Sequence, residues 1–191
     1  KFIGMTDEVK AAYSLLVFTP ETLFALRDRF GVRPLSIGKL DGGYLVCSED
    51  YTFDQYPDCK HVRDIEPGEM VIFERDVKDF KSRKYAEDKE HFCVFESIYF
   101  SHPRSTYNGF FNEDFRMELG RQLYNENPNL EGDVVVPVLD SGKHAAWGLS
   151  ELMGVPYREH FLRVHNPPRI NLRSFTSATD EERIKTAYQK L

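Results

Sequence analysis

Hydrophobic residues in the first 75 positions occur in short runs separated by turn residues, a pattern typical of β-hairpins. Residues 11–28 read AAYSLLVFTPETLFALRD and predict two strands joined at Thr19-Pro20-Glu21-Thr22, because proline fits a turn and cannot donate to a strand ladder. The segment is therefore expected to be a β-rich unit. Its other strand-like runs are residues 34–40, 44–49 and 70–75, with turns predicted at Asp41-Gly42-Gly43 and at residues 66–69.

Residues 76–91, DVKDFKSRKYAEDKEH, break this pattern because they are polar and highly charged. They predict a solvated loop without regular structure, and such a stretch is a plausible domain boundary. The chain is therefore divided into residues 1–91 and residues 92–191.

The periodicity changes after this loop. Residues 93–100, CVFESIYF, are apolar enough to predict a strand. Asn112 is expected to cap a helix whose first turn carries Glu113 and Asp114, since acidic side chains suit the positive end of a helix. One face of that helix would carry Phe115, Leu119 and Leu123.

Residues 133–138, DVVVPV, show no polar alternation, which is typical of a strand in a sheet covered on both faces. A helix is predicted from about Gly142 to Met153, with Gly154 and Pro156 as its C-terminal signals. Residues 156–164 predict a further strand. Strand–helix–strand units of this kind indicate an α/β domain.

The last 27 residues open as a loop rich in proline and arginine. Thr179 and Glu182 form a capping box, which predicts a short helix from there to the end of the chain. Residues 164–178 offer little apolar surface to offset the cost of ordering their backbone, so they are predicted to be a mobile lid; a rigid proline-containing surface loop is the alternative.

Composition narrows the class of protein. The 191 residues can bury a core without disulfides or metals, and a net charge of −6 with a pI of about 5.6 argues against nucleic acid as a partner. Three scattered cysteines favour a reducing, cytoplasmic compartment over a disulfide framework. No apolar run reaches the length of a membrane span, and the first ten residues lack the apolar centre of a signal peptide.

The abrupt end of the valine-rich strand is the strongest chemical feature. Asp140-Ser141-Gly142 forms a bend between a strand and a helix, where free helix N–H groups favour an anion and Gly142 permits close approach to the backbone. The Asp140 carboxylate would repel a phosphate unless Lys143 or a bound Mg²⁺ lay between them. Alternatively, Asp140 or Ser141 is the helix N-cap, a role compatible with anion binding. No P-loop pattern is present.

Several stretches, in this order, resemble the amidophosphoribosyltransferases, also called glutamine phosphoribosylpyrophosphate amidotransferases. The phrase RDRFGVRPL alone is weak, because asparagine synthetases carry a similar one, but those enzymes continue into an ATP-pyrophosphatase signature that is absent here. The later phrases make the resemblance more specific. The matching phrases are AAYSLLV, ALRDRFGVRPLSIG, YLVCSE, VRDIEPGEMVIF, CVFESIYFSHPRS and DVVVPVLDSGKHAAWGLSELMGVPY.

The resemblance implies a fold of two parts. Residues 1–91 would be the later part of an Ntn-hydrolase glutaminase domain, of α+β class, and residues 92–191 the first part of a type I phosphoribosyltransferase domain, of α/β class. The implied reaction joins ammonia from glutamine to phosphoribosylpyrophosphate (PRPP), with Mg²⁺, in purine biosynthesis. The resemblance also implies a cytoplasmic homo-oligomer regulated by purine nucleotides.

The resemblance assigns binding residues but no catalytic residue to this chain. Asp140, Ser141 and Gly142 would hold the pyrophosphate of PRPP, with Lys143 beside them. Arg163 stands where the family usually has a lysine, and Arg173 lies in RSFT, which resembles the Arg-Thr-Phe end of the family's flexible loop; both cations suit a phosphate ligand. Cys93 matches a ligand of a 4Fe–4S cluster in some members, although a small buried hydrophobic residue is the alternative.

The chain departs from the family at two places. Residues 164–172, VHNPPRINL, fit the family's Lys-Asn-Arg-Tyr-Val-Gly phrase poorly, and in SHPRS His102 replaces an arginine and Arg104 an acid. The N-terminal cysteine of the glutaminase and the Asp-Asp-Ser signature of the transferase are also missing, so an internal segment that is inactive alone is expected. The alternative is a non-catalytic, nucleotide-binding regulatory or scaffold protein.

Overall fold

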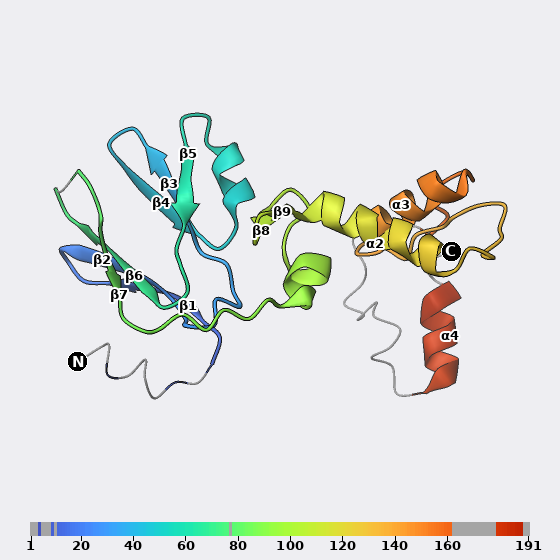
Figure 1. The fold of residues 1–191 in the computed structure, drawn as a ribbon, viewed down its shortest axis with the longest axis horizontal. Coiled ribbons are helices and arrows are strands. Elements are labelled where there is room, and N and C mark those ends of the chain that lie inside the picture. Colours follow the sequence, from blue (N-terminus) through green and yellow to red (C-terminus); the bar gives the residue numbers. More distant parts are fainter. Residues whose placement is uncertain (1–3, 5–8, 10, 77, 162–178, 189–191) are drawn as a thin grey trace. The chain divides into compact units, whose positions relative to one another are not determined.

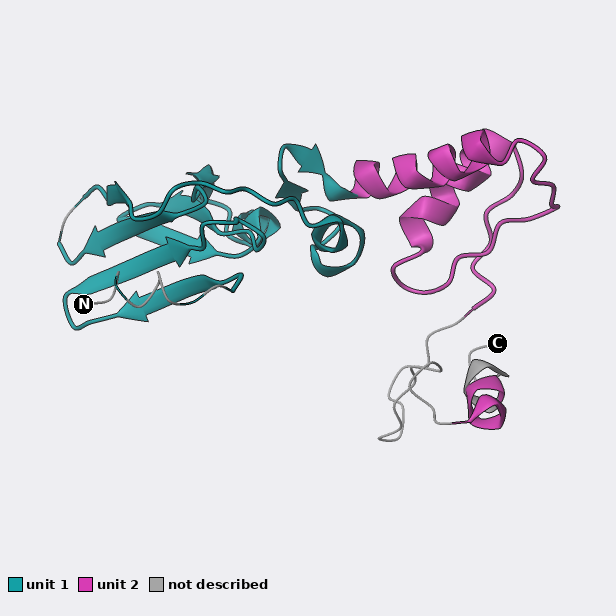
Figure 2. Ribbon diagram, turned by 60° about the horizontal axis from the view of Figure 1, so that its bottom comes forward, with its two compact units in different colours: residues 1–112 teal, residues 113–191 magenta. Residues whose placement is uncertain are grey.

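The computed structural model describes Gly4, Val9 and residues 11–76, 78–161 and 179–188. The chain divides into two compact units, residues 1–112 and residues 113–191 (Figure 2). Residues 92–112 thus group with the first unit, whereas the domain boundary expected after residue 91, from the charged stretch and from the resemblance, stays a prediction. Among the described residues, no helix combines the length and the apolar character that crossing a membrane requires.

The first unit contains an antiparallel sheet of four strands in the order β1-β2-β6-β7 (Figure 1). The predicted turn between its first two strands is confirmed, since the Thr19 N–H donates to the Thr22 carbonyl at 2.8 Å. The strand predicted over residues 70–75 is confirmed within a residue. The four strands are β1 (Ser14–Phe18), β2 (Thr22–Arg27), β6 (Glu69–Glu74) and β7 (Lys81–Lys84).

A second antiparallel sheet has three strands in the order β4-β3-β5. The hairpin predicted around Asp41-Gly42-Gly43 is confirmed, and Gly42 adopts a φ of 79°, which favours glycine. Between the second and third strands in the chain lies a 3₁₀ helix that the sequence pattern did not predict. These elements are β3 (Ser36–Leu40), β4 (Gly43–Cys47), η1 (Asp50–Gln55) and β5 (Lys60–Asp64).

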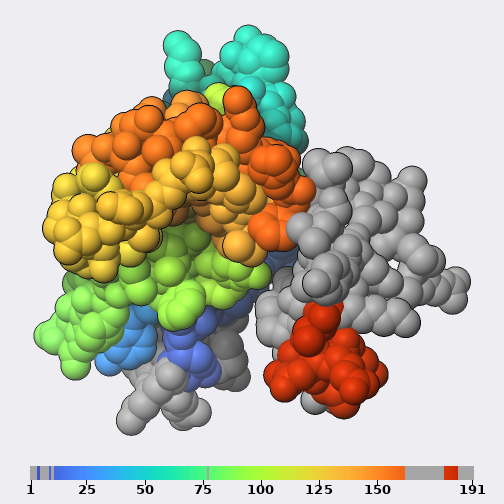
Figure 3. Space-filling model, turned by 90° about the vertical axis from the view of Figure 1, so that its right-hand side faces the viewer, coloured from blue at the N-terminus to red at the C-terminus, as the bar shows by residue number. Residues whose placement is uncertain are grey.

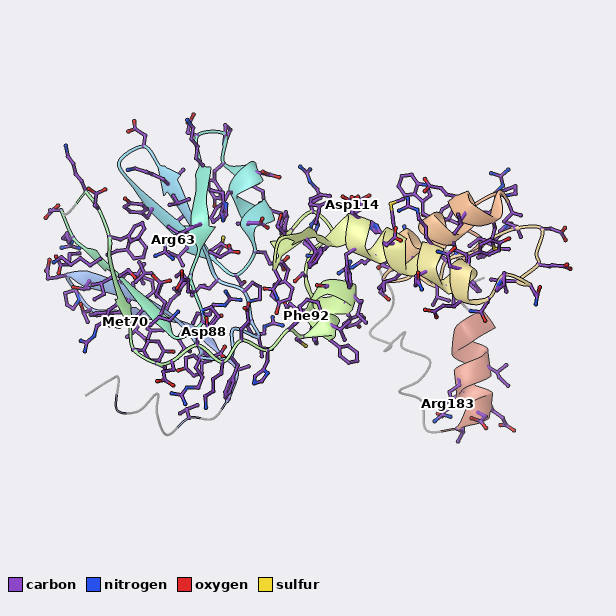
Figure 4. The ribbon with its side chains drawn as sticks, in the orientation of Figure 1. Arg63, Met70, Asp88, Phe92, Asp114 and Arg183 are labelled. Atoms are coloured by element: carbon purple, nitrogen blue, oxygen red, sulfur yellow. The ribbon has the colours of Figure 1, made fainter. Side chains whose placement is uncertain are left out.

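The core of the first unit joins residues of both sheets. Ala25 of β2 and Val71 of β6 cluster with Ile37 of β3, and all three are fully buried. Figure 4 labels Arg63 on β5 and Met70 on β6, both in this unit. Non-directional burial of this apolar surface is the main force that stabilises the unit. The remaining members are Leu35 and Ile65, with partly buried Tyr44, Val46, Phe73 and Phe80 packed against them.

The RDRFGVRPL segment leaves β2 through a turn organised by two buried charged residues. The Arg27 guanidinium donates to the carbonyls of Arg33 (2.9 Å), Ile65 (2.8 Å) and Gly31 (2.7 Å). The Asp28 carboxylate accepts from the Gly31 N–H at 3.1 Å and so closes the turn. Gly31 has a φ of 60°, and a Cβ there would lie 2.6 Å from Pro67, so the turn requires glycine.

Two predictions for residues 76–100 are wrong. The charged stretch 76–91 is not wholly a loop, because β7 lies within it and pairs with β6 although all four of its residues are exposed. Residues 93–100 form no strand; Glu96–Phe100 (η2) is a π-helical turn closed by the Ser101 N–H donating to the Glu96 carbonyl at 2.8 Å. The turn places the Glu96 carboxylate inside the unit, where Arg33 donates to it at 2.6 Å.

The unusual SHPRS stretch packs against η1. The His102 ring stacks on Tyr51 with centroids 3.9 Å apart, and Arg104 forms an ion pair with Asp54 at 3.0 Å. The Glu49 carboxylate accepts from the His102 N–H at 2.5 Å and from the Ser105 hydroxyl at 2.7 Å. His102 and Arg104, which depart from the family's phrase, therefore have partners in this fold.

A short hairpin and a long helix follow this contact. The hairpin β8 (Thr106–Tyr107) and β9 (Phe110–Phe111) turns at Asn108-Gly109, both with positive φ. Helix α2 (Asn112–Glu126) then begins with Asn112 itself, whose Oδ1 has no hydrogen-bond partner among the described residues, so the predicted capping role of Asn112 is wrong. Glu113 and Asp114 lie in the first turn as predicted (Figure 4). The predicted apolar face is largely exposed within the described chain: Leu119 is 41% and Leu123 49% accessible.

The second unit is built on the packing of α2 against α3 (Lys143–Met153), through small residues. A Cβ on Gly120 would lie 1.8 Å from the Ala145 carbonyl oxygen, and one on Gly148 would lie 2.0 Å from that of Met117. The two helix backbones therefore approach closely at the points where one of them has a glycine. In Figure 3 the yellow-to-orange atoms of residues 120–155 form one mass.

The predicted strands of the second unit are reduced to one point of pairing. Residues 133–138 and 156–161 are not regular strands, and Val135 and Tyr157 form an isolated parallel bridge. The rest of the second predicted strand, residues 162–164, lies outside the described residues. One bridged pair of residues does not make a sheet, because a parallel sheet needs neighbouring strands on both sides that continue the backbone pairing. The predicted C-terminal helix is confirmed as α4 (Asp180–Tyr188), with the Glu182 N–H donating to the Thr179 hydroxyl at 3.3 Å.

Candidate anion-binding bend

The bend after the valine-rich segment lies between the Val135–Tyr157 bridge and α3. The Val135 N–H donates to the Pro156 carbonyl at 2.9 Å, and the Arg158 N–H donates to the Val135 carbonyl at 3.0 Å. These two bonds fix residues 156–158 beside the segment that leads into the bend. Because the pair is parallel, both segments run toward the same edge, where ligands bind in open α/β sheets.

Backbone hydrogen bonds shape the bend itself. The Gly142 N–H donates to the Val138 carbonyl at 3.0 Å, and the Lys143 N–H donates to the Asp140 carbonyl at 3.3 Å. The Leu139–Asp140 peptide bond is cis. Asp140 and Ser141 are exposed, so a ligand can reach them from solvent.

Gly142 is the N-cap residue of α3, so neither Asp140 nor Ser141 occupies that position. Its φ of −80° is open to any residue, but a Cβ there would lie 2.7 Å from the Val138 carbonyl oxygen. Glycine is therefore required by the close approach of the two backbone segments. The helix that starts here directs its N-terminal N–H groups toward the bend, the arrangement in which helices bind anions.

The charges around the bend are mixed. The Lys143 ammonium pairs with the Glu159 carboxylate, 3.1 Å from Oε1, and the Tyr157 hydroxyl donates to the same carboxylate at 3.1 Å. These bonds from Lys143 and Tyr157 lower the pKa of Glu159, so it is ionised at neutral pH. Burial lowers the pKa of the neighbouring His144, which therefore adds no cation at neutral pH.

This balance bears on what the bend can bind. Asp140 and Glu159 contribute two carboxylates, and Lys143 contributes one ammonium group. A bare polyphosphate would meet repulsion here, whereas a polyphosphate carrying a divalent cation would not. The expectation that Lys143 or a bound Mg²⁺ would lie between Asp140 and a phosphate stays a prediction.

The other predicted site residues are not brought to this bend by the described structure. Arg163, Arg173 and the predicted lid over residues 164–178 lie outside the described residues. Cys93 is a partly buried free thiol of the first unit. Within the described residues, no cluster of three or more His, Cys, Asp or Glu side chains could hold a metal ion, so the cluster role of Cys93 stays a prediction.

Glu159 and Tyr157 are the participants that the sequence reasoning missed. Both lie in a segment that was predicted only as a strand; Tyr157 ends the phrase of residues 133–157 that resembles the family, but no role was assigned to it. Their place beside Lys143 depends on the parallel pairing of Tyr157 with Val135, 22 positions earlier in the chain. Such pairing leaves no local signal, so only the three-dimensional arrangement could reveal it.

Comparison with known proteins identifies relatives along most of the chain. No family model matches it. The chain is 42% identical over 159 residues to the amidophosphoribosyltransferase of Pyrococcus horikoshii, which covers 82% of this chain and 34% of the relative. It is 40% identical over 161 residues to that of Mycobacterium tuberculosis, covering 84% of this chain and 30% of the relative.

Solved structures agree with these relatives. A structure described as the allosteric regulatory enzyme of purine biosynthesis matches with a TM-score of 0.80 and 33% identity, covering 96% of this chain and 38% of the other. The glutamine PRPP amidotransferase of B. subtilis, complexed with ADP and GMP, matches with the same score and identity and 39% of its chain covered. The chain is therefore homologous to the amidophosphoribosyltransferases over a segment that spans about a third of their length.

Proposed function

We propose that the complete protein containing this chain is an amidophosphoribosyltransferase, which joins glutamine-derived ammonia to PRPP. The observation that carries the proposal is the identity of about 40% to enzymes of that name over a segment that includes the bend before α3. In the reaction, ammonia nitrogen bonds to ribose C1 as the bond from C1 to the pyrophosphate oxygen breaks. Pyrophosphate leaves with the electron pair, and the amine loses a proton.

This chain would contribute the part of the site that holds the leaving group. The exposed Ser141 hydroxyl can donate to pyrophosphate oxygens, and the positive end of the α3 dipole favours them. The Asp140 carboxylate can accept from the hydration shell of an Mg²⁺ ion that accompanies the substrate. Fixing the pyrophosphate in one orientation lowers the barrier by holding C1 ready for attack.

We also propose that the chain contains parts of two domains with different activities. Residues 1–91 would belong to the glutaminase domain, and residues 92–191 would begin the phosphoribosyltransferase domain. PRPP, glutamine, Mg²⁺ and purine nucleotide effectors would be ligands of the complete protein, a homo-oligomer of the cytoplasm. The alternative is a non-catalytic nucleotide-binding protein, and the contacts of His102 with Tyr51 and of Arg104 with Asp54 are compatible with either function.

Replacement of Asp140 tests the proposal. In the complete protein, we expect Asp140→Ala to weaken PRPP binding in the presence of Mg²⁺ by about tenfold or more, since a charge-assisted hydrogen bond contributes about 1.5–3 kcal/mol. Glutamine hydrolysis measured without PRPP should be retained, because the bend would serve only the transferase reaction. Equilibrium binding and ammonia release measure the two effects separately.

The exposed carboxylate of Asp133 provides a matched control, since it precedes the valine-rich segment. Asp133→Ala should leave both measurements unchanged. Equal loss of both activities in Asp140→Ala, with the protein folded, would assign the bend a structural role and contradict the proposal. Unchanged PRPP binding would contradict it as well.

A further inference from the structure

The ion pair between Lys143 and Glu159 stands directly at the proposed pyrophosphate site. The Lys143 Nζ lies 3.1 Å from Oε1 and 3.2 Å from Oε2 of Glu159, so the ammonium group engages both carboxylate oxygens. Lys143 is the first residue of α3 and follows the bend immediately. The cation best placed to meet an anion in the bend is thus occupied by a carboxylate of the chain itself.

Neighbouring contacts fix the position of Glu159. The Tyr157 hydroxyl donates to Oε1 at 3.1 Å, and the bridge to Val135 holds the Tyr157 backbone. The carboxylate is therefore held by two partners, the Tyr157 hydroxyl and the Lys143 ammonium group. Burial of the Tyr157 ring raises its pKa to about 12, so the hydroxyl stays protonated and remains a donor.

The pair is open to competition by a ligand. The side chains of Lys143 and Glu159 are 37% and 43% exposed, so an anion from solvent can reach both. Ion pairs with this exposure are weak, and a pyrophosphate carries more charge than a single carboxylate. An anion in the bend would also be repelled directly by Glu159 for as long as that carboxylate remains beside Lys143.

We propose that Glu159 is an affinity-determining residue of this site, which occupies Lys143 and thereby weakens the binding of pyrophosphate groups. The inference rests on the proposed function, because it assumes that the bend binds pyrophosphate. Pyrophosphate is also the product that must leave, so a residue that competes for Lys143 favours its release. Both the competition and the direct repulsion act in the same direction.

The variant Glu159→Gln tests this inference because it removes the charge and keeps the size of the side chain. In the complete protein with Mg²⁺ present, we expect inorganic pyrophosphate to bind about three- to tenfold more tightly than to the wild type. The control is Glu151→Gln, which breaks another exposed ion pair of α3, between Glu151 and Arg121 at 2.7 Å. That variant should bind pyrophosphate with unchanged affinity.

A double-mutant cycle with Lys143→Met separates the two contributions. If Glu159 acts through Lys143, the gain from Glu159→Gln should largely disappear in the Lys143→Met background. An unchanged or lowered affinity in Glu159→Gln, or an equal gain in both backgrounds, would overturn the inference. If neither the wild type nor any variant binds pyrophosphate, the proposed function itself fails, and the inference fails with it.

Discussion

Two buried carboxylates of the first unit have pKa values that are shifted in opposite directions, because burial and hydrogen bonding oppose each other. Glu69 and Glu96 are 3% and 2% exposed, and each pairs with an arginine. Burial alone would raise the pKa of Glu69, but hydrogen bonds from Arg63, Ser82 and the Glu66 N–H outweigh it and lower the pKa. For Glu96 burial prevails and the pKa is raised, although Arg33 and Ser101 oppose the shift.

Replacement of Glu69 and of Glu96 by glutamine should therefore lower the stability of the protein by different amounts. We expect Glu69→Gln to lower the free energy of unfolding at pH 7 by about 2–3 kcal/mol, because Arg63 loses its partner. Glu96→Gln should cost less than about 1 kcal/mol, since the ionised form of Glu96 is already penalised and the Arg33 side chain is 44% exposed. Urea denaturation of both variants at pH 7 measures the difference, and equal costs would contradict this account.

The same comparison has a defined dependence on pH. The pKa of Glu69 in the folded state lies below the reference value of 4.5. The ionised carboxylate therefore contributes to stability above pH 4.5, and this contribution is lost as the pH falls through the folded pKa. The difference in the free energy of unfolding between the wild type and Glu69→Gln should therefore become smaller below pH 4.5. A difference that grows on acidification would contradict the lowered pKa of Glu69.

At the scale of elements, the hairpins could be predicted because two local signals agreed. The runs that became β1, β2, β3 and β4 combine apolar residues with turn residues that break the ladder. The strands β5 and β7 lacked the first signal, since all four residues of β7 are exposed and β5 reads KHVRD. Edge strands with polar faces carry no periodicity that distinguishes them from loops.

Two apolar runs without periodicity were wrongly predicted as strands, because tertiary contacts decide their structure. Residues 93–100 could equally be a strand or a helix, and the buried contact of Glu96 with Arg33 selects the π-helical turn. Residues 133–138 were predicted as a strand because strands of parallel sheets read this way, yet one bridge is all that the described chain provides. The bend itself could be predicted, because aspartate, serine and glycine between a strand and a helix form a local signal.

The contact of α2 with α3 yields a prediction about helix packing. Gly120→Ala would gain about 1 kcal/mol of helix propensity, but the new Cβ would lie 1.8 Å from the Ala145 carbonyl oxygen. The helices must separate, so we expect a net loss of about 2 kcal/mol or more in the stability of the second unit. Gly148→Ala should behave in the same way, because its Cβ would meet the Met117 carbonyl oxygen at 2.0 Å.

A glycine of the same unit outside this contact serves as the control. A Cβ on Gly132 would have its nearest neighbour at 4.0 Å, so Gly132→Ala should leave stability unchanged or raise it slightly. Thermal unfolding followed by circular dichroism compares the three variants. Equal stability of Gly120→Ala and Gly132→Ala would show that the helix backbones are not in contact.

On the scale of the whole chain, the two units differ in how much apolar surface they bury. In the described residues, the buried hydrophobic side chains of the first unit include Leu26, Ile37 and Val71, all fully inaccessible. The second unit contributes Val135, at 9% exposure, whereas Val138 and Trp147 are 74% and 48% exposed. Because buried apolar area is the main source of stability, the second unit should be the less stable one.

Hydrogen exchange on the chain tests whether the units are separate cooperative units with this order of stability. Each has its own packed centre, and local unfolding follows such centres. Amides of α3 should exchange faster than those of β2, β3 and β6. Ile37→Ala, which empties a buried position at a cost of about 2–5 kcal/mol, should accelerate exchange in both sheets and leave α3 unchanged. Gly148→Ala should accelerate exchange in α3 and leave exchange in both sheets unchanged. If either substitution accelerates exchange throughout the chain, the two units unfold as one, and their separate centres do not govern stability.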